Sequence, residues 1–244
     1  MISVFKKQAG ATSSGFNALG RPLKFRNAAE AGCSIVRLMP EDGLVFYLPL
    51  DKDASTAVTG QGLSKSGTVT YETVDGIPCA YFYNGVIWSN DLDGLPSGSS
   101  PRTISAWVRP TADTDFDGYA FGYGNRAANM YYGIDIDANS GQTVYIACSG
   151  NSAPSNRPVY NANAWHHIVG AYDGSLLRFY VNGNMTANEA FPTAKLETSL
   201  SQIDIGGVSN NNGLYIKGHV AGCRIYNRAL TDEEVKMLSK EFKI

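Results

Sequence analysis

Three aspartates alternate with other residues in the stretch Asp113-Thr114-Asp115-Phe116-Asp117-Gly118. Oxygen ligands at positions 1, 3 and 5 of a short loop can surround one hard cation such as Ca²⁺. A complete loop of this type needs a bidentate glutamate at position twelve, where this chain has Gly124. Asp113, Asp115 and Asp117 are therefore candidate calcium ligands, and the alternative is a solvated acidic turn between strands.

Two of the three histidines stand side by side in the stretch AWHHIVGAYDG, at His166 and His167. Neighbouring side chains in a strand point to opposite faces, so these imidazoles cannot readily chelate one metal ion. We interpret the pair as structural, with one ring facing the core and the other facing outward.

Asp135 and Asp137 share one face of a predicted strand, about 7 Å apart on strand geometry. Two carboxylates at this separation could suit glycoside hydrolysis. No glutamate lies nearby, and the chain has no Ser-His-Asp proximity, phosphate-cradling glycine loop or nucleotide fingerprint. The sequence therefore predicts no catalytic residue, with a glycoside hydrolase as the less favoured alternative.

Glycan binding needs aromatic platforms with amide or charged groups beside them. The candidate platforms are Tyr119, Tyr123, Tyr131 and Tyr132. The candidate polar partners are Asn151, Arg157, Asn210 and Asn211. The alternative is that these aromatic rings fill the interior.

The elements that must position these residues are mostly strands. From Gly43 onward, short apolar or alternating runs such as RTISAWVRP and QTVYIACSG recur about every ten residues, with Gly and Asn between them. Asp173-Gly174 predicts a hairpin turn. This pattern predicts an all-β fold, a two-sheet antiparallel β-sandwich of the jelly-roll type.

Only the C-terminal end is predicted to be helical. Thr231 stands three residues before Glu234, which is the spacing of a capping box. Val235, Leu238 and Phe242 then form one apolar stripe that should lie on the sandwich.

Composition limits the class of protein. The chain has 244 residues, 43% hydrophobic and 17% charged, which is enough apolar material for a core. Its net charge of −2 argues against bulk nucleic-acid binding. No apolar stretch approaches the roughly 18 residues of a membrane-spanning helix, and no secretory signal is visible. Cys79, Cys148 and Cys223 lie in strand-like runs and are predicted to be small buried thiols.

Residues 1–42 differ in composition from the rest of the chain. They mix small polar residues with scattered apolar anchors, and residues 1–40 hold six Lys or Arg but a single Glu. We expect a basic N-terminal extended arm on an acidic body, and the alternative is a solvated tail. The predicted organisation is an anchoring arm over residues 1–42 and a sandwich with its C-terminal helix over residues 43–244.

The stretches TISAWVRP, WHHIVGAYDGSLLRFYVNG and GHVAGCRIYNRALTDEEVKML resemble the laminin G-like jelly rolls of the concanavalin A-like superfamily, in the expected order. The resemblance covers roughly residues 43–240. It implies two antiparallel sheets packed face to face, in a family whose members are mostly non-catalytic modules that bind glycans or proteins or act as spacers. The Glu-x-Asp-x-x-Glu strand of the superfamily's glucanases is absent.

Many members of that family hold one Ca²⁺ near the rim through a carboxylate at the end of the first strand, which Asp51 matches. The family's closing strand commonly reads Asp-Glu-Val, whereas this chain has Ala221-Gly222-Cys223. The two carboxylates expected to complete the site are therefore missing. Ca²⁺ stays the only cofactor that the sequence suggests.

These observations predict a non-enzymatic structural or adhesion protein that displays the sandwich for glycan or protein binding. A phage or prophage virion would reconcile such a fold with the lack of an export signal. The arm would dock on neighbouring protein subunits of an oligomer or larger assembly, and a cell-surface glycan would be the ligand. The chain would be made in the host cytoplasm, without nucleic-acid binding or membrane insertion. The alternative is a bacterial carbohydrate-binding module of a surface or secreted protein.

Overall fold

The structure is a computed structural model that describes residues 39–55, 63–148, 152–190, 195–209 and 214–242. This part of the chain contains thirteen strands and one helix. Their bounds are β1 Leu44–Leu48, β2 Ser64–Val74, β3 Ile77–Ser89, β4 Arg102–Pro110, β5 Asp117–Gly124, β6 Tyr131–Asp137, β7 Thr143–Ala147, β8 Ser152–Ala153, β9 His166–Tyr172, β10 Leu177–Val181, β11 Asn184–Glu189, β12 Ile203–Ile205, β13 Lys217–Tyr226 and α1 Asp232–Leu238.

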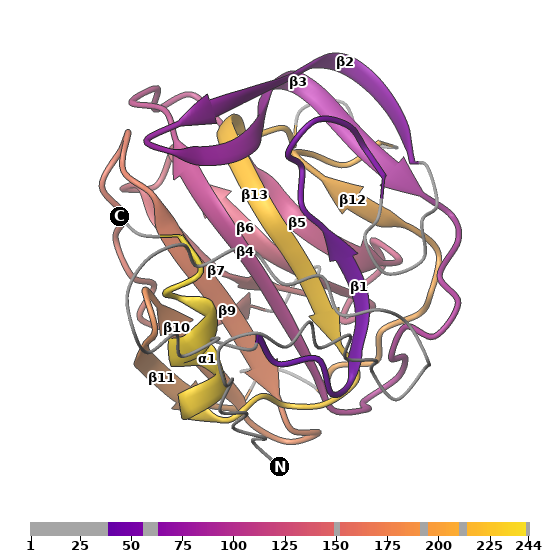
Figure 1. Cartoon of the computed structure of the whole chain (residues 1–244). Helices are drawn as coiled ribbons and strands as arrows, with labels where there is room; N and C mark the ends of the chain where they lie inside the picture. The colour runs from indigo at the N-terminus through magenta and orange to yellow at the C-terminus, as the bar shows by residue number, and fades with distance from the viewer. Residues whose placement is uncertain (1–38, 56–62, 149–151, 191–194, 210–213, 243–244) are drawn as a thin grey trace, which may run out of the picture.

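The strands form two layers joined along one edge. The hydrogen-bonded order is β11-β10-β9-β4-β13-β3-β12-β5-β6-β7-β8, with β1 added to β13 and β2 added to β3. All of these pairings are antiparallel. β4 packs across from β5 and β6, and β9 packs across from β6, so the ladder folds back into the predicted sandwich (Figure 1). The long strand β3 belongs to both layers, because one half pairs with β13 and the other half pairs with β12.

Alternation along each strand decides which side chains fill the space between the layers. In β3, Ala80 and Phe82 join the main core, whereas Tyr81 and Tyr83 point to the outer face of the first layer. In β6, Ile134 and Ile136 are in the same core. The interior is therefore built from every second residue, as strand geometry requires.

The C-terminal segment covers part of the outer face of the first layer. Helix α1 begins with the predicted capping box, in which the Thr231 hydroxyl accepts from the Glu234 N–H and the Glu234 carboxylate accepts from the Thr231 N–H. Val235 and Leu238 pack in a second core with residues of β9 and β10. Phe242 lies beyond the end of the helix, contrary to the expectation of one helical stripe, but still packs edge-on against Trp107.

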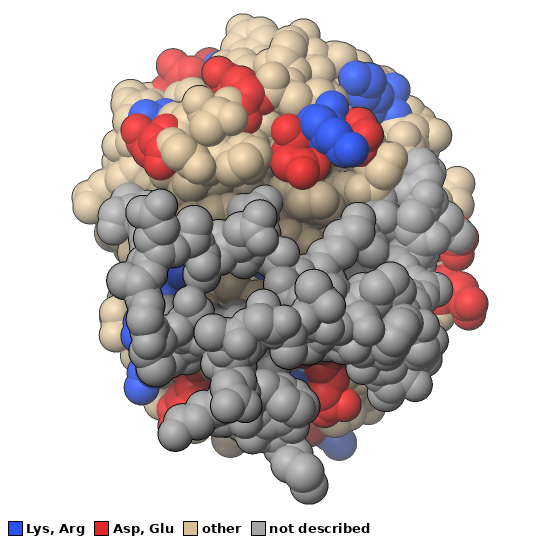
Figure 2. Space-filling view, in the orientation of Figure 1, with Lys and Arg blue, Asp and Glu red and all other residues tan. Residues whose placement is uncertain are grey.

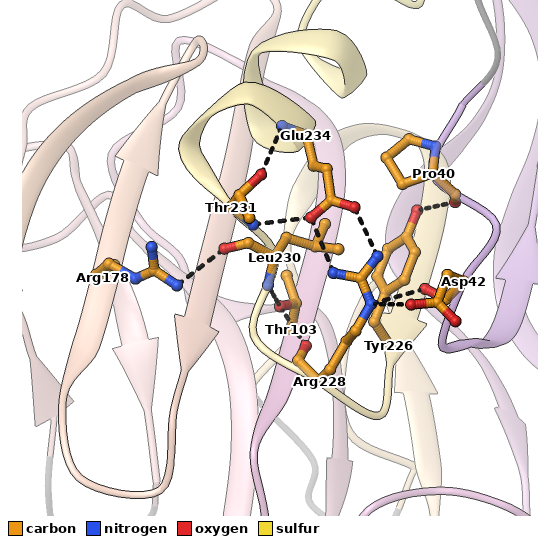
Figure 3. A network of polar contacts seen from close by, with 9 residues as sticks. All are labelled: Pro40, Asp42, Thr103, Arg178, Tyr226, Arg228, Leu230, Thr231 and Glu234. Atoms are coloured by element: carbon orange, nitrogen blue, oxygen red, sulfur yellow. Dashed lines mark hydrogen bonds and ion pairs between the residues drawn. The ribbon is translucent and has the colours of Figure 1, made fainter. Parts of the chain in front are cut away.

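The last residues of the predicted arm that the structure describes are tied to the closing strand and turn. The Tyr226 hydroxyl donates to the Pro40 carbonyl oxygen at 3.1 Å. Arg228 forms two hydrogen bonds to the Glu234 carboxylate, of 2.6 and 2.8 Å, and an ion pair of 3.0 Å with Asp42 (Figure 3). Arg228 therefore links the start of β1 to the start of α1.

Two smaller sequence predictions are confirmed. Asp173 begins the turn between β9 and β10, where its carboxylate accepts the N–H groups of Ser175 and Leu176 and Gly174 has φ of 101°. Cys79, Cys148 and Cys223 are buried, as predicted, while Cys33 lies outside the described residues. In the described part of the chain, no helix is long and apolar enough to span a bilayer.

Candidate functional site

The structure does not bring the three predicted calcium ligands together. Asp113 accepts a hydrogen bond from the Thr111 hydroxyl, and Asp115 pairs with Lys217. Asp117 instead lies beside Asp135 and raises the pKa of that carboxyl. Among the described residues, no group of three or more His, Cys, Asp or Glu side chains could hold a metal ion.

The family's rim position also lacks a fitting donor set. Asp51 is exposed just after β1. At the end of β1, Leu48 pairs with Cys223 of the closing strand β13. The Gly222 N–H donates to the Pro49 carbonyl oxygen. Burial raises the pKa of the Cys223 thiol, which disfavours the thiolate. A hard cation prefers several oxygen ligands, so these residues do not fit Ca²⁺.

The two histidines lie on opposite faces of β9, as expected, but the outward-facing ring is not exposed to solvent, since both histidines are buried. His166 Nε2 lies 3.0 Å from the Asn161 carbonyl oxygen. His167 lies on the outer face, where the C-terminal segment covers it, and its Nε2 is 2.9 Å from Ser105 Oγ. Burial lowers the pKa of His167 to about 3, so the ring is neutral and structural at ordinary pH.

The four tyrosines predicted as glycan platforms are buried, which corrects that prediction: Tyr119, Tyr123, Tyr131 and Tyr132. Tyr123 and Tyr132 lie in the main core, where their hydroxyls donate to the carbonyl oxygens of Pro96 and Gly170. Tyr119 and Tyr131 lie on the other side of the layer. There they pack with Val208 and Leu214.

Glycines let the Tyr131 ring lie flat on the second layer. A Cβ atom on Gly122 or on Gly133 would come within 2.5 Å of that ring or its hydroxyl. The Tyr119 ring meets the Tyr131 ring edge-on, and the Arg126 guanidinium lies 4.6 Å from the Tyr119 ring centroid. The ring faces are thus occupied by the protein itself, which leaves no stacking surface for a sugar.

The predicted polar partners fall into two groups. Asn151, Asn210 and Asn211 lie outside the described residues. Arg157 lies 3.5 Å above the Tyr145 ring centroid and pairs with Asp137 at 3.4 Å. It is therefore part of an acidic cluster on the outer face of β5, β6 and β7.

This acidic cluster consists of Asp117, Asp135 and Asp137 with Arg157. Burial is the main reason why the pKa of Asp135 is raised well above its ordinary value, and the Asp117 carboxylate adds to the rise. Asp135 therefore holds its proton more readily than an exposed aspartate does. Only 4% of Asp135 is exposed, and Asp137 accepts from the Ser140 N–H as well as Arg157. A sugar would have to displace these partners before reaching either carboxylate.

An open aromatic and charged surface lies on the outer face of the first layer, where β2, β3 and β13 meet. We call it the β3–β13 surface and define it by Glu72, Tyr81, Tyr83, Asp115, Lys217 and His219. Figure 2 shows acidic and basic side chains close together over β2 and β3 on this side of the molecule. Tyr83 is 45% exposed, which makes its ring available to a ligand.

Strand pairing explains why these side chains meet. Lys217 is directly opposite Tyr83, and His219 is directly opposite Tyr81. The Lys217 ammonium lies 5.7 Å from the Tyr83 ring centroid and 2.5 Å from the Asp115 carboxylate. That hydrogen bond lowers the pKa of Asp115 and raises the pKa of Lys217, so both groups stay charged.

The second half of the surface repeats this arrangement with an imidazole. His219 Nε2 lies 3.0 Å from the Glu72 carboxylate. Its ring is 4.9 Å from the Tyr81 ring and 6.2 Å from the Trp165 ring, centroid to centroid. Aromatic rings edged by carboxylates and cations are the groups that bind sugar C–H faces and hydroxyls, so this surface is the candidate binding site.

The sequence prediction missed this surface, although a signal was present. The stretch AYFYN has aromatic residues at three successive positions, and alternation must send Phe82 to one face and Tyr81 and Tyr83 to the other. The neighbours Lys217 and His219 are 134 or more residues away in sequence, so only the register of β13 on β3 reveals the cluster.

Comparisons with known proteins agree with this fold. A sequence model of the family described as the concanavalin A-like lectin/glucanases superfamily matches residues 83–236, more than half of the chain. The chain is also 28% identical over 116 residues to the adhesion G-protein coupled receptor V1 of Danio rerio. That match covers 45% of this chain and about 2% of the receptor.

Several solved structures share the fold. Domain 4 of AbnA, a GH43 extracellular arabinanase from Geobacillus stearothermophilus solved with arabinotriose, superposes with a TM-score of 0.61 at 20% identity, over 82% of this chain and 100% of that chain. The binding domain of Paraclostridial Mosquitocidal Protein 1 gives a TM-score of 0.58 at 16% identity, over 81% and 52% of the two chains. Trypanosoma rangeli sialidase gives 0.59 at 16% identity, over 87% and 35%.

Proposed function

Because the chain belongs to the concanavalin A-like lectin/glucanases superfamily, we propose that its sandwich is a non-catalytic module that binds a glycan on the β3–β13 surface. The observation that carries the proposal is the exposed Tyr83 ring beside the Lys217–Asp115 pair. A sugar can stack its C–H face on such a ring while its hydroxyls bond to the charged groups. Domain 4 of AbnA, which has the same fold, was solved in complex with arabinotriose, which adds support for a glycan ligand.

A glycan array and isothermal titration test this function. Tyr83→Ala removes the ring and is expected to weaken binding at least tenfold, whereas Tyr83→Phe keeps the ring and should retain most of the affinity. Met185→Ala is the matched control, because Met185 is 49% exposed on β11, away from this surface. No binding across a broad array, or binding that survives Tyr83→Ala, would contradict the proposed site.

We also propose that residues 1–42 anchor the sandwich in a phage or prophage particle, where the module would serve adhesion or decoration. The support is the basic character of residues 1–40 and the ion pair of Arg228 with Asp42, which ties residue 42, the end of the predicted arm, to the sandwich (Figure 3). A basic arm can dock on an acidic neighbouring subunit. The alternative is a carbohydrate-binding module on a bacterial surface or in a secreted protein.

Sedimentation of the full chain separates these two settings. An arm that docks on neighbouring copies or subunits predicts an assembly larger than a monomer, and substituting Lys6, Lys7 and Lys24 by Gln should weaken it. A monomer at all concentrations that also fails to join particles would contradict the virion setting and leave the binding module intact.

A further inference from the structure

Two cationic side chains and one imidazole lie next to one another on the outer face of β4 and β13. Lys217 and His219 are two residues apart on β13, and His219 is directly opposite Arg109 on β4. Each is joined to a carboxylate from another segment. The pairs are Lys217 with Asp115 at 2.5 Å, His219 with Glu72 at 3.0 Å and Arg109 with Asp75 at 3.5 Å.

Exposure is unequal within every pair. The side chains of Lys217, His219 and Arg109 are 15%, 10% and 20% exposed. Their carboxylate partners Asp115, Glu72 and Asp75 are 73%, 48% and 58% exposed. A ligand that approaches from solution therefore meets the carboxylates first, with the cations behind them.

While its three carboxylates are ionised, this row carries no net positive charge. If His219 is protonated, the three pairs sum to zero, and if it is neutral the row carries one negative charge. Asp113 adds a further exposed carboxylate, since its hydrogen bond is to the neutral Thr111 hydroxyl, and its charge acts on both Lys217 and Tyr81. An anionic sugar would thus face like charge, whereas sugar hydroxyls can donate to these carboxylate oxygens.

We infer that the β3–β13 surface, with Asp75 and Arg109 added, selects uncharged glycans and rejects sialylated or sulfated ones through its outward carboxylates. This inference rests on the proposed function. The Tyr83 ring supplies a stacking face that any hexose or pentose can use, so the ring gives affinity. The carboxylates give selectivity, because they act against one class of ligand.

The test is a glycan array on which each core oligosaccharide appears in neutral, sialylated and sulfated forms, followed by titration of the full chain with the best core in all three forms. The wild-type chain should bind the neutral form at least tenfold more tightly than either anionic form. Raising the salt concentration should reduce this ratio, because exposed charges are screened within about 10 Å at 0.1 M.

A triple variant, Glu72→Gln, Asp75→Asn and Asp115→Asn, exposes the cations. It should lose several-fold affinity for the neutral form and gain at least tenfold for the anionic forms. Glu233→Gln is the matched control, because Glu233 is an exposed carboxylate on α1. It should change the affinity neither for the neutral form nor for the anionic forms. Thermal melting shows whether the triple variant is folded. If it is unfolded, the affinities of the single variant Asp115→Asn and the salt dependence of the wild type test the inference instead.

Two results would overturn the inference alone. One is a wild-type chain that binds an anionic form as tightly as its neutral core, and the other is a neutral preference that the triple variant leaves unchanged. Binding to no glycan, or binding that does not respond to Tyr83→Ala, would instead overturn the proposed function and the inference with it.

Discussion

His167 Nε2 lies 2.9 Å from Ser105 Oγ between β9 and β4, and the imidazole is fully buried. The pKa of His167 is lowered to about 3, whereas an unfolded chain titrates near 6.5. Between pH 6.5 and about 3 the imidazole is therefore protonated in the unfolded state but neutral in the folded state. Stability is expected to fall by about 1.4 kcal/mol for each pH unit in this window, until pH approaches 3.

His167→Gln should remove this acid-side loss. Glutamine can still bond to Ser105, so we expect the variant to lose about 1 kcal/mol at pH 7.5 and to approach or exceed the wild type at pH 4.5. Urea unfolding of the variant and the wild type at the two pH values measures both differences in the free energy of unfolding. Ser105→Ala is the control, because it removes the same hydrogen bond and keeps the imidazole, so its acid loss should persist. An unchanged acid loss in His167→Gln would contradict the assignment.

Asp204 has the opposite effect on the pH dependence. Burial raises the pKa of Asp204 to about 7, against 3.8 for an exposed aspartate. Between these values the folded state keeps a proton that the unfolded state releases, so this group makes the fold less stable as pH rises from about 4 to 7. Asp204→Asn cannot ionise, and its amide oxygen can still accept from the Ser209 N–H.

We therefore expect Asp204→Asn to raise the free energy of unfolding by about 1 kcal/mol or more at pH 8, with little effect at pH 4. Denaturant titrations at both pH values test it. Asp53→Asn, which replaces an exposed carboxylate, is the comparison variant. An Asp204→Asn variant that is less stable than the wild type at pH 8 would show that the carboxylate is ionised and favourable there.

The C-terminal segment shows which features of the fold can be predicted from the sequence. The capping box at Thr231 and Glu234 could be predicted because both partners are local, three residues apart. The buried state of His167 could not, because it depends on α1 and Phe242 covering the outer face of a strand some 70 residues earlier. Local patterns give elements and the alternation of their faces. Which faces stay open depends on distant segments.

The tyrosine predictions failed for the same reason. Val208 and Leu214 from a later segment cover Tyr119 and Tyr131 on the outer face, and a register shift between Tyr119 and Phe121 places Tyr123 in the main core although simple alternation would keep it on the face of Tyr119. Tyr83 also lies in an aromatic strand sequence, but its ring remains exposed. Nothing local in the two stretches separates the covered rings from the open one.

Thr231→Ala tests the contribution of the helix cap. Losing the hydrogen bond that the Glu234 N–H donates to the Thr231 hydroxyl oxygen should cost about 1 kcal/mol of stability, whereas Thr231→Ser should cost much less. Thermal unfolding of the three proteins gives the comparison. Equal losses in the alanine and serine variants would show that the methyl group, and not the hydroxyl, carries the effect.

Gly133→Ala tests the close packing of Tyr131 on the second layer. A Cβ on Gly133 would lie 2.5 Å from Tyr131 Cε1, so we expect a loss of about 1–3 kcal/mol from overpacking. Tyr131→Val removes the ring, and the double variant should lose less than the sum of the two single losses. Strict additivity in chemical denaturation would mean that the ring moves away without cost.

Asp135→Asn and Asp137→Asn test the absence of catalysis. Asp135 is buried and Asp137 is held by Arg157 and the Ser140 N–H, so neither can flank a glycosidic bond without rearrangement of the cluster. We expect the wild-type chain to release no reducing ends from a panel of polysaccharides that includes arabinan. Both variants should bind glycans on the β3–β13 surface as the wild type does. Hydrolysis that Asp135→Asn or Asp137→Asn abolishes, with folding intact by circular dichroism, would instead make the acidic cluster an active site, because a glycosidase requires such a carboxylate pair.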